Sequence, residues 1–284
     1  MFAKLLKYDL KAISRFFLIT VSILVACCTM SAIAIKVLAG IEASEVATLF
    51  DVLAVMVLIV TILAVSAATV GMAIVIYLRF YNNFFTDEGY LTFTLPVSRG
   101  QLLRSKTLSA MIYTLAYLLI AIVCVLVVLF VFVESIEKGA LAELAVILKE
   151  AKVELLKIIS AWWVVAYTFA FIVTVVLSLF FGICLVQFCI TVAAVIAKKA
   201  RIFIAIVIYY GINMVISIIS RIFLGVVLAG FTSDFAEKIS RLSNNGQMLA
   251  VLLLVFIVCA FFACISALLY YATRNLLERK LNLA

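Results

Sequence analysis

The sequence contains no histidine and a single proline, Pro96, and only 13% of its 284 residues are charged. Without histidine the chain cannot carry an H-E-x-x-H metal motif, and it also lacks a G-x-S-x-G nucleophile motif. No G-x-x-x-x-G-K-[ST] phosphate loop occurs either, so we expect no ATP site of that kind in this chain. These absences argue against an enzyme.

Apolar residues make up 69% of the chain, whereas a soluble domain has roughly 45 to 50%. A helix needs about 20 apolar residues to cross a hydrocarbon core of about 30 Å, and charged segments separate six such runs. We therefore predict an all-α polytopic membrane protein with a single transmembrane domain over residues 1–284. The six expected spans are 16–38, 52–78, 108–133, 160–186, 202–221 and 249–271.

The distribution of basic residues predicts the orientation, because Lys and Arg accumulate on the cytoplasmic side of membranes. If the N-terminus is cytoplasmic, the inner segments hold 14 of the 22 basic residues, and the outer segments hold most of the acidic ones. Both termini are then expected on the cytoplasmic side. We expect the chain to be a multi-pass protein of the plasma membrane. The net charge of +8 follows from this bias and from attraction to lipid headgroups, and we expect no nucleic-acid partner.

The seven cysteines all lie in or next to apolar runs, where cysteine is usually a small hydrophobic residue. No histidine is present to complete a ligand set, so we expect neither a metal site nor a cofactor in this chain. The cysteines are Cys27, Cys28, Cys124, Cys184, Cys189, Cys259 and Cys264.

Residues 1–15 are predicted to form an amphipathic helix with a basic stripe from Lys4 to Arg15. This pattern is typical of an interfacial elbow helix that lies on the inner leaflet. Asp9 falls on the apolar face of this helix, where a bare carboxylate is costly. We predict an ion pair between Asp9 and either Arg79 or Arg99. The alternative is a rotated helix in which Asp9 reaches lipid headgroups or water.

The later part of the chain contains three further features. The fourth apolar run continues to Ala197, so we expect either a bend at Gly182 or a helix that continues into the cytoplasm. The outer segment 134–159 has an amphipathic pattern and should lie on the outer surface. A second outer segment, 222–248, begins with an apolar piece of about ten residues, a length that suits a re-entrant or interfacial piece.

Residues 79–107 form the polar segment between the second and third spans. Thr86 is a predicted N-cap, and the acidic pair that follows suits the first turn of a helix. Pro96 would end this short helix, and Ser98 with Gln101 fits a capping box for the next one. The short helix would carry apolar side chains on a cytoplasmic loop, where they need a covering surface. Either a groove in a partner protein or this chain's own elbow helix would supply it.

The stretch DEGYLTFTLPVSRGQLLRSK resembles the coupling-helix loop of ABC-2 type transporter permeases, particularly the small six-span permeases of Gram-positive bacteria. The opening KLLKYDLKAISR resembles the elbow helix that begins those permeases. The long outer stretch at 137–157 departs from the short loops of many members.

The resemblance implies that the loop docks on a separate ABC ATPase subunit, which would bind ATP and Mg²⁺. It also implies a second permease chain, either identical or a sister chain. The docking residues that it implies are Asp87, Glu88, Gly89, Tyr90, Leu91, Phe93, Leu95, Pro96 and Arg99.

The translocation path is less well defined by the sequence. No Asp, Glu, His or Arg lies near the centre of a predicted span, which disfavours ion coupling. The sparse polar groups suggest a hydrophobic or amphipathic cargo such as a peptide, lipid or drug, which an ATP-driven permease of this kind would export. The alternative is a non-transporting receptor or immunity protein that sequesters a peptide at the outer face.

The fifth span carries polar residues that either line a path or hydrogen-bond between helices: Tyr209, Tyr210, Asn213, Ser217 and Ser220.

Overall fold

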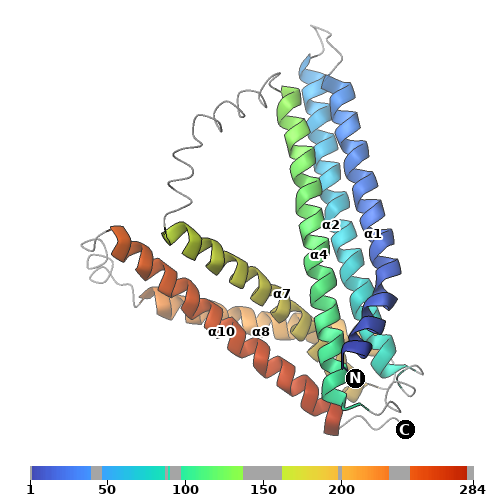
Figure 1. Cartoon of the computed structure of the whole chain (residues 1–284), viewed down its shortest axis with the longest axis vertical. Helices are drawn as coiled ribbons and strands as arrows, with labels where there is room; N and C mark the ends of the chain where they lie inside the picture. Colours follow the sequence, from blue (N-terminus) through green and yellow to red (C-terminus); the bar gives the residue numbers. More distant parts are fainter. Residues whose placement is uncertain are drawn as a thin grey trace. The chain divides into compact units, whose positions relative to one another are not determined.

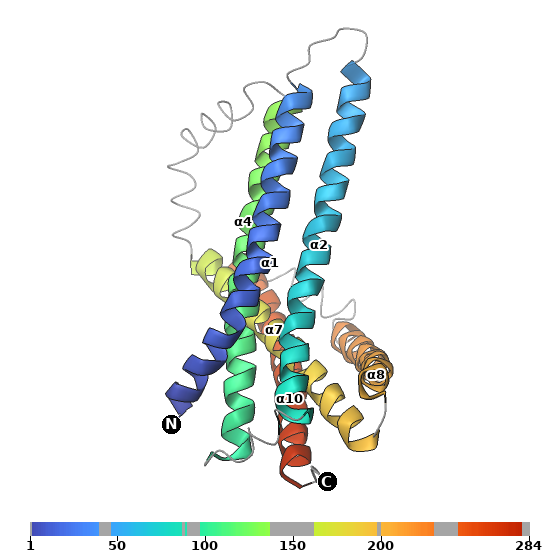
Figure 2. The ribbon, with the colours of Figure 1, turned by 90° about the vertical axis from the view of Figure 1, so that its right-hand side faces the viewer.

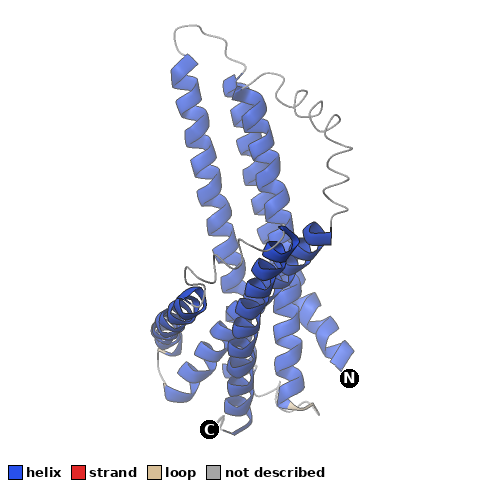
Figure 3. Cartoon of the chain, turned by 90° about the vertical axis from the view of Figure 1, so that its left-hand side faces the viewer, coloured by secondary structure: helices blue, strands red, loops and turns tan. Residues whose placement is uncertain are grey.

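A computed structural model describes residues 2–39, 47–86, 89, 97–136, 162–197, 200–229 and 244–279. Every element within these ranges is an α-helix, as Figure 3 shows. In chain order they are α1 (Phe2–Ala39), α2 (Ala47–Phe85), α4 (Arg99–Ile136), α7 (Trp162–Ile196), α8 (Arg201–Ala229) and α10 (Asn244–Arg279), as labelled in Figure 1.

Each of these helices contains a stretch that is long and apolar enough to cross a membrane. The six predicted spans fall one to each helix, so the prediction of an all-helical chain with six helices long and apolar enough to span a membrane is confirmed for the described residues. The helices are longer than the spans. The 39 residues of α2, for example, measure about 58 Å at 1.5 Å per residue, which exceeds a hydrocarbon core of about 30 Å.

The predicted elbow helix and first span form one uninterrupted helix, α1. Figure 2 shows the first turns of α1 leaning away from the rest of the helix. The hydroxyl of Ser14 donates to the carbonyl of Lys11 at 2.7 Å, and that of Thr20 donates to the carbonyl of Phe17 at 2.9 Å. Hydroxyls that bond back to the preceding turn often accompany bends in helices.

Two expected irregularities are continuous helix in the structure. α7 runs through Gly182 and ends at Ile196, as in the alternative in which the fourth helix continues past the span. Residues 222–229 extend α8, so the described part of the expected re-entrant piece forms the end of that helix. This apolar run does not require a re-entrant segment, because within α8 its backbone hydrogen bonds are satisfied inside one helix. The remainder of segment 222–248 up to residue 243, and residues 137–161 around the outer amphipathic stretch, lie outside the described residues.

The chain divides into two compact units, the first of which comprises Met1–Arg79 and Leu108–Glu154. In this unit α1, α2 and α4 lie alongside one another (Figures 1 and 2). The core contains Cys28, Ile35 and Val128, with partly buried residues of α2 and α4 packed against them. This unit is therefore held together mainly by apolar packing along three helices.

The second unit comprises Phe80–Thr107 and Leu155–Ala284. α7 packs against both α10 and α8. α8 and α10 also contact each other directly: Phe223 of α8 stacks on Phe261 of α10, with 4.0 Å between ring centroids and 6° between planes. The hydroxyl of Tyr167 on α7 donates to the carbonyl of Met248 on α10 at 2.9 Å. α7 is therefore the central helix of this unit.

Large apolar side chains cover the outside of the helices. Leu18 is 62% exposed, Val60 is 63% exposed and Phe171 is 69% exposed. A water-soluble protein rarely exposes so extensive an apolar surface, because such a surface promotes association. Lipid tails are as apolar as leucine and solvate it at little cost. The burial pattern therefore agrees with a multi-pass membrane protein.

Candidate functional site at the α2–α4 junction

Of the polar segment 79–107, the structure describes residues 79–86, Gly89 and residues 97–107. We define the α2–α4 junction as residues 80–86, Gly89 and residues 97–103. Of the nine predicted docking residues, Gly89 and Arg99 belong to the junction. The other seven lie outside the described residues: Asp87, Glu88, Tyr90, Leu91, Phe93, Leu95 and Pro96.

The last turns of α2 are anchored by aromatic packing. Phe80, Phe84 and Phe85 are all buried, and Phe84 is completely so. The rings of Phe80 and Phe84 have centroids 4.9 Å apart, and those of Phe80 and Phe85 are 6.2 Å apart. Such pairs add to the stability that their buried area provides. The end of α2, where the chain enters the connection to α4, is therefore tightly packed.

The hydroxyl of Thr86 is engaged with the helix that ends beside it. It donates to the carbonyl of Asn82 at 2.5 Å, four residues earlier in α2. This bond satisfies a carbonyl at the end of α2, where the last carbonyls of a helix lack intrahelical donors. The hydroxyl oxygen can still accept a hydrogen bond, so the predicted N-cap role of Thr86 toward the residues that follow it stays a prediction.

Gly89 occupies a position with no room for a side chain. Its amide donates to the carbonyl of Thr86 at 2.7 Å. A Cβ at this position would lie 2.8 Å from the carbonyl oxygen of Phe84, so the backbone would have to shift to accept any other residue. This contact gives Gly89 a local structural role, whether or not a partner also touches it.

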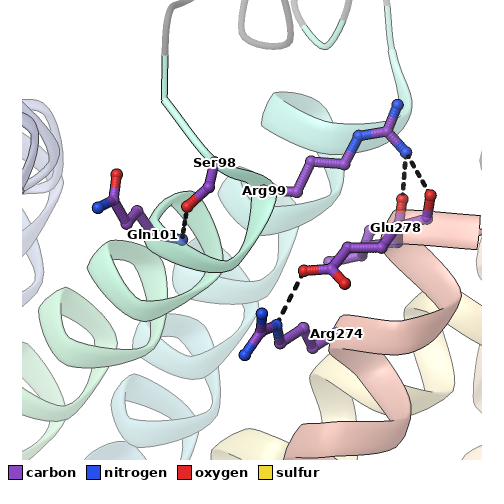
Figure 4. Close-up of polar contacts among 6 residues, drawn as sticks. Ser98, Arg99, Gln101, Arg274 and Glu278 are labelled. Atoms are coloured by element: carbon purple, nitrogen blue, oxygen red, sulfur yellow. Dashed lines mark hydrogen bonds and ion pairs between the residues drawn. The ribbon is translucent and has the colours of Figure 1, made fainter.

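The start of α4 has the predicted N-cap. α4 begins at Arg99, directly after Ser98. The amide of Gln101 donates to the Ser98 carbonyl at 2.9 Å and lies 3.4 Å from its side-chain oxygen (Figure 4). The serine half of the predicted capping box is therefore present, and it fixes where the chain enters α4.

Arg99 binds the end of α10. Its Nη1 donates to the carbonyl of Leu277 at 2.6 Å and to that of Glu278 at 3.2 Å (Figure 4). Beside this contact, Nε of Arg274 donates to the Glu278 carboxylate at 2.8 Å. A Cβ on Gly100 would lie 3.1 Å from the same Arg274 nitrogen, so a glycine there permits the close approach of α4 and α10.

Arg201, the first residue of α8, makes the matching contact at the other end of the junction. Its Nη1 donates to the carbonyl of Phe85 at 3.0 Å, and its Nε donates to that of Ala197 at 3.1 Å. Ala200, just before it, has a φ of 57°, in the left-handed region that non-glycine residues seldom adopt. The sequence analysis did not predict this contact, since no sequence pattern relates Arg201 to Phe85, 116 residues earlier.

Asp9 lies on the inward side of α1, as its place in the helical pattern predicted. It is 6% exposed and takes part in a polar interaction, whereas Lys4, Lys7, Lys11 and Arg15 are exposed. Nη1 of Arg79 donates to the carbonyl of Ala12, close to Asp9 along α1, at 3.0 Å. Arg79 is thus the arginine that the described contacts bring to α1, and the ion pair itself stays a prediction.

The candidate path residues all lie on α8 and, at about 100° per residue, on one side of it. The rings of Tyr209 and Tyr210 contact one another, with centroids 5.7 Å apart, and Tyr210 is 68% exposed. Asn213 and Ser217 are exposed, and the hydroxyl of Ser220 donates to the carbonyl of Ile216 in its own helix at 2.7 Å.

A buried polar contact that we did not predict joins α4 to α7. The hydroxyl of Thr107 lies 2.9 Å from Oε1 of Gln187, and both residues are buried. Gln187 is the only amide side chain in α7, which could have marked it as a residue that hydrogen-bonds between helices.

Within the described ranges, no three side chains of the His, Cys, Asp or Glu type are grouped so as to hold a metal ion. No protein-family model, curated protein or solved structure matches the chain.

Proposed function

We propose that this chain is the permease subunit of an ATP-driven ABC transporter that exports a hydrophobic or amphipathic substrate from the cell. A separate ATPase subunit binds ATP and Mg²⁺ and docks on the connection between α2 and α4. Two permease chains, identical or sister, form the membrane unit in the plasma membrane. The proposal draws on the resemblance of residues 87–106 to a coupling-helix loop and on the six apolar helices.

The observation that carries the proposal is the anchoring of both ends of this connection. Arg201 holds the end of α2 through the Phe85 carbonyl, and Arg99 ties the start of α4 to the last turn of α10. A connection that receives force from a partner needs firm attachment to the membrane helices, because a loose one would absorb the movement. Closure of the ATPases on ATP would then pull on the connection and rock the two permease chains.

Copurification with an ABC ATPase tests this proposal, and ATPases encoded near the gene of this chain are the first candidates. The tagged wild-type chain should retain the ATPase in detergent, and the complex should hydrolyse ATP. Glu88→Arg and Tyr90→Ala should lower the amount of retained ATPase by roughly tenfold or more, as hot-spot residues do. Tyr271→Ala is the matched control, since Tyr271 is 63% exposed on α10 and lies outside the predicted docking set.

Three outcomes contradict the proposal in different ways. Equal loss of ATPase in the control would indicate general damage to the chain rather than a docking site. An intact complex in both docking variants would place the docking site elsewhere. If the wild-type chain retains no ATPase, the permease proposal fails and a membrane protein that sequesters a peptide at the outer face becomes the better account.

A further inference from the structure

Two arginines bracket the connection between α2 and α4. The chain leaves α2 after Phe85, whose carbonyl accepts from Arg201 at 3.0 Å. It enters α4 at Arg99, which donates to the carbonyl of Leu277 at 2.6 Å. The two contacts span 116 and 178 residues of sequence, so each ties the connection to a distant helix.

The atoms in these contacts are suited to carry a displacement. Phe85 is the last residue of α2, and Leu277 lies in the last turn of α10, where carbonyls lack intrahelical donors and carry the negative end of the helix dipole. The guanidinium is permanently charged and planar, and its donors have fixed directions. Both acceptors are backbone atoms, so a shift of either arginine acts on the helix itself and is not absorbed by rotation of an acceptor side chain.

The surroundings of the two contacts leave little room for rearrangement. Phe84 and Leu277 are completely buried, and Leu102 is 1% exposed. The absence of a side chain at Gly100 brings α4 within van der Waals range of Arg274. Packed interiors transmit strain, because their side chains cannot move independently.

We infer that Arg99 and Arg201 are positioning residues that transmit a displacement of the α2–α4 connection to α10 and to α8. α7 packs against both of these helices, so the whole second unit receives the movement. The inference rests on the proposed function, in which the docked ATPase supplies the displacement. Neither arginine touches nucleotide or substrate in this scheme.

The two tryptophans of the chain, Trp162 and Trp163, offer a local reporter because both stand at the start of α7. The permease chain is labelled with 5-fluorotryptophan and combined with unlabelled ATPase in nanodiscs, and its ¹⁹F spectrum is recorded with and without a non-hydrolysable ATP analogue. We expect a nucleotide-dependent shift in the wild-type complex. Arg201→Ala should lose at least about half of it while it still retains the ATPase. Arg99→Ala should also lose at least about half of it, measured on complexes with the same amount of bound ATPase as wild type because Arg99 is also a predicted docking residue.

Two further variants separate transmission from stability. Arg15→Ala removes an exposed arginine from α1 and should leave the ¹⁹F response intact. Arg99→Lys keeps the charge but not the planar donor group, so it should restore only part of the response. Full responses in both alanine variants, with the ATPase bound, would overturn the inference and leave the proposed function standing.

Hydrogen exchange on the permease chain alone provides a test that needs no ATPase. Arg99→Ala should speed amide exchange in the last turns of α10 by about tenfold or more, since a hydrogen bond from a charged group is lost. Unchanged exchange there would also overturn the inference. A wild-type chain that binds no ATPase would remove the source of the displacement, and the inference would then fall together with the proposed function.

Discussion

α7 and α8 follow one another in the chain and are both apolar enough to cross a membrane, yet they differ in how they pack. Of the apolar stretch of α7, 22% is buried, whereas none of that of α8 is. α7 has small buried residues such as Ala170, Cys184 and Ala193, which let neighbouring helices approach closely. Hydrophobicity therefore predicts that both helices suit lipid but not which of them packs, because α8 also carries small and polar residues, such as Gly211 and Ser217, and they are exposed.

Substitution of a small residue by a larger one should give the largest difference between the two helices. Ala193 of α7 is 1% exposed, so Ala193→Leu should destabilise the protein by about 1–3 kcal/mol through overpacking. Gly211 of α8 has no atom within 4 Å of its ideal Cβ position, so Gly211→Leu should cause no loss. The stability of both variants is measured by thermal unfolding in detergent, with gel filtration to monitor the folded fraction. Equal losses of stability would contradict the difference in packing between α7 and α8.

The contact between Thr107 and Gln187 should give a smaller effect. A double-mutant cycle with Thr107→Val and Gln187→Leu should yield a coupling energy of about 0.6 kcal/mol and no more than about 1.7 kcal/mol, the average and the maximum found for hydrogen bonds between membrane helices. The cycle is measured by unfolding in mixed detergent and SDS. Ser220→Ala on α8 serves as a control, because its hydroxyl bonds only within its own helix in the described structure. If the effects of the two single substitutions on the free energy of unfolding are additive, the hydrogen bond contributes nothing beyond the packing of the two side chains.

Asn213 should show the smallest effect on stability. It is exposed on α8, so Asn213→Leu should change the free energy of unfolding by no more than about 0.5 kcal/mol. A change in the ATPase rate of the assembled complex without a change in unfolding would favour a place on the translocation path. A loss above about 1 kcal/mol would instead mean that the amide stabilises the folded chain, and α8 would then resemble α7.

Much of the fold could be predicted because its signals are local. The six helices follow from apolar runs, and the start of α4 follows from Ser98 and Gln101. The inward position of Asp9 follows from its place in a helical pattern. The sequence was less informative about contacts between helices, as at Arg201, whose hydrogen bond to the Phe85 carbonyl no local pattern indicates. It was also less informative at residues 222–229, where a short apolar run in isolation resembles the end of a longer helix.

The local sequence is sufficient to predict that this chain forms six long helices suited to lipid and that a polar connection joins the second and third of them. Hydrophobicity and helix capping depend on neighbouring residues, so they can be read from the chain directly. The contacts of Arg99 with α10 and of Arg201 with the end of α2 depend on the tertiary structure and could not be predicted from the local sequence. A guanidinium will bind any free carbonyl within reach, and which carbonyl is within reach depends on how helices distant in sequence pack together.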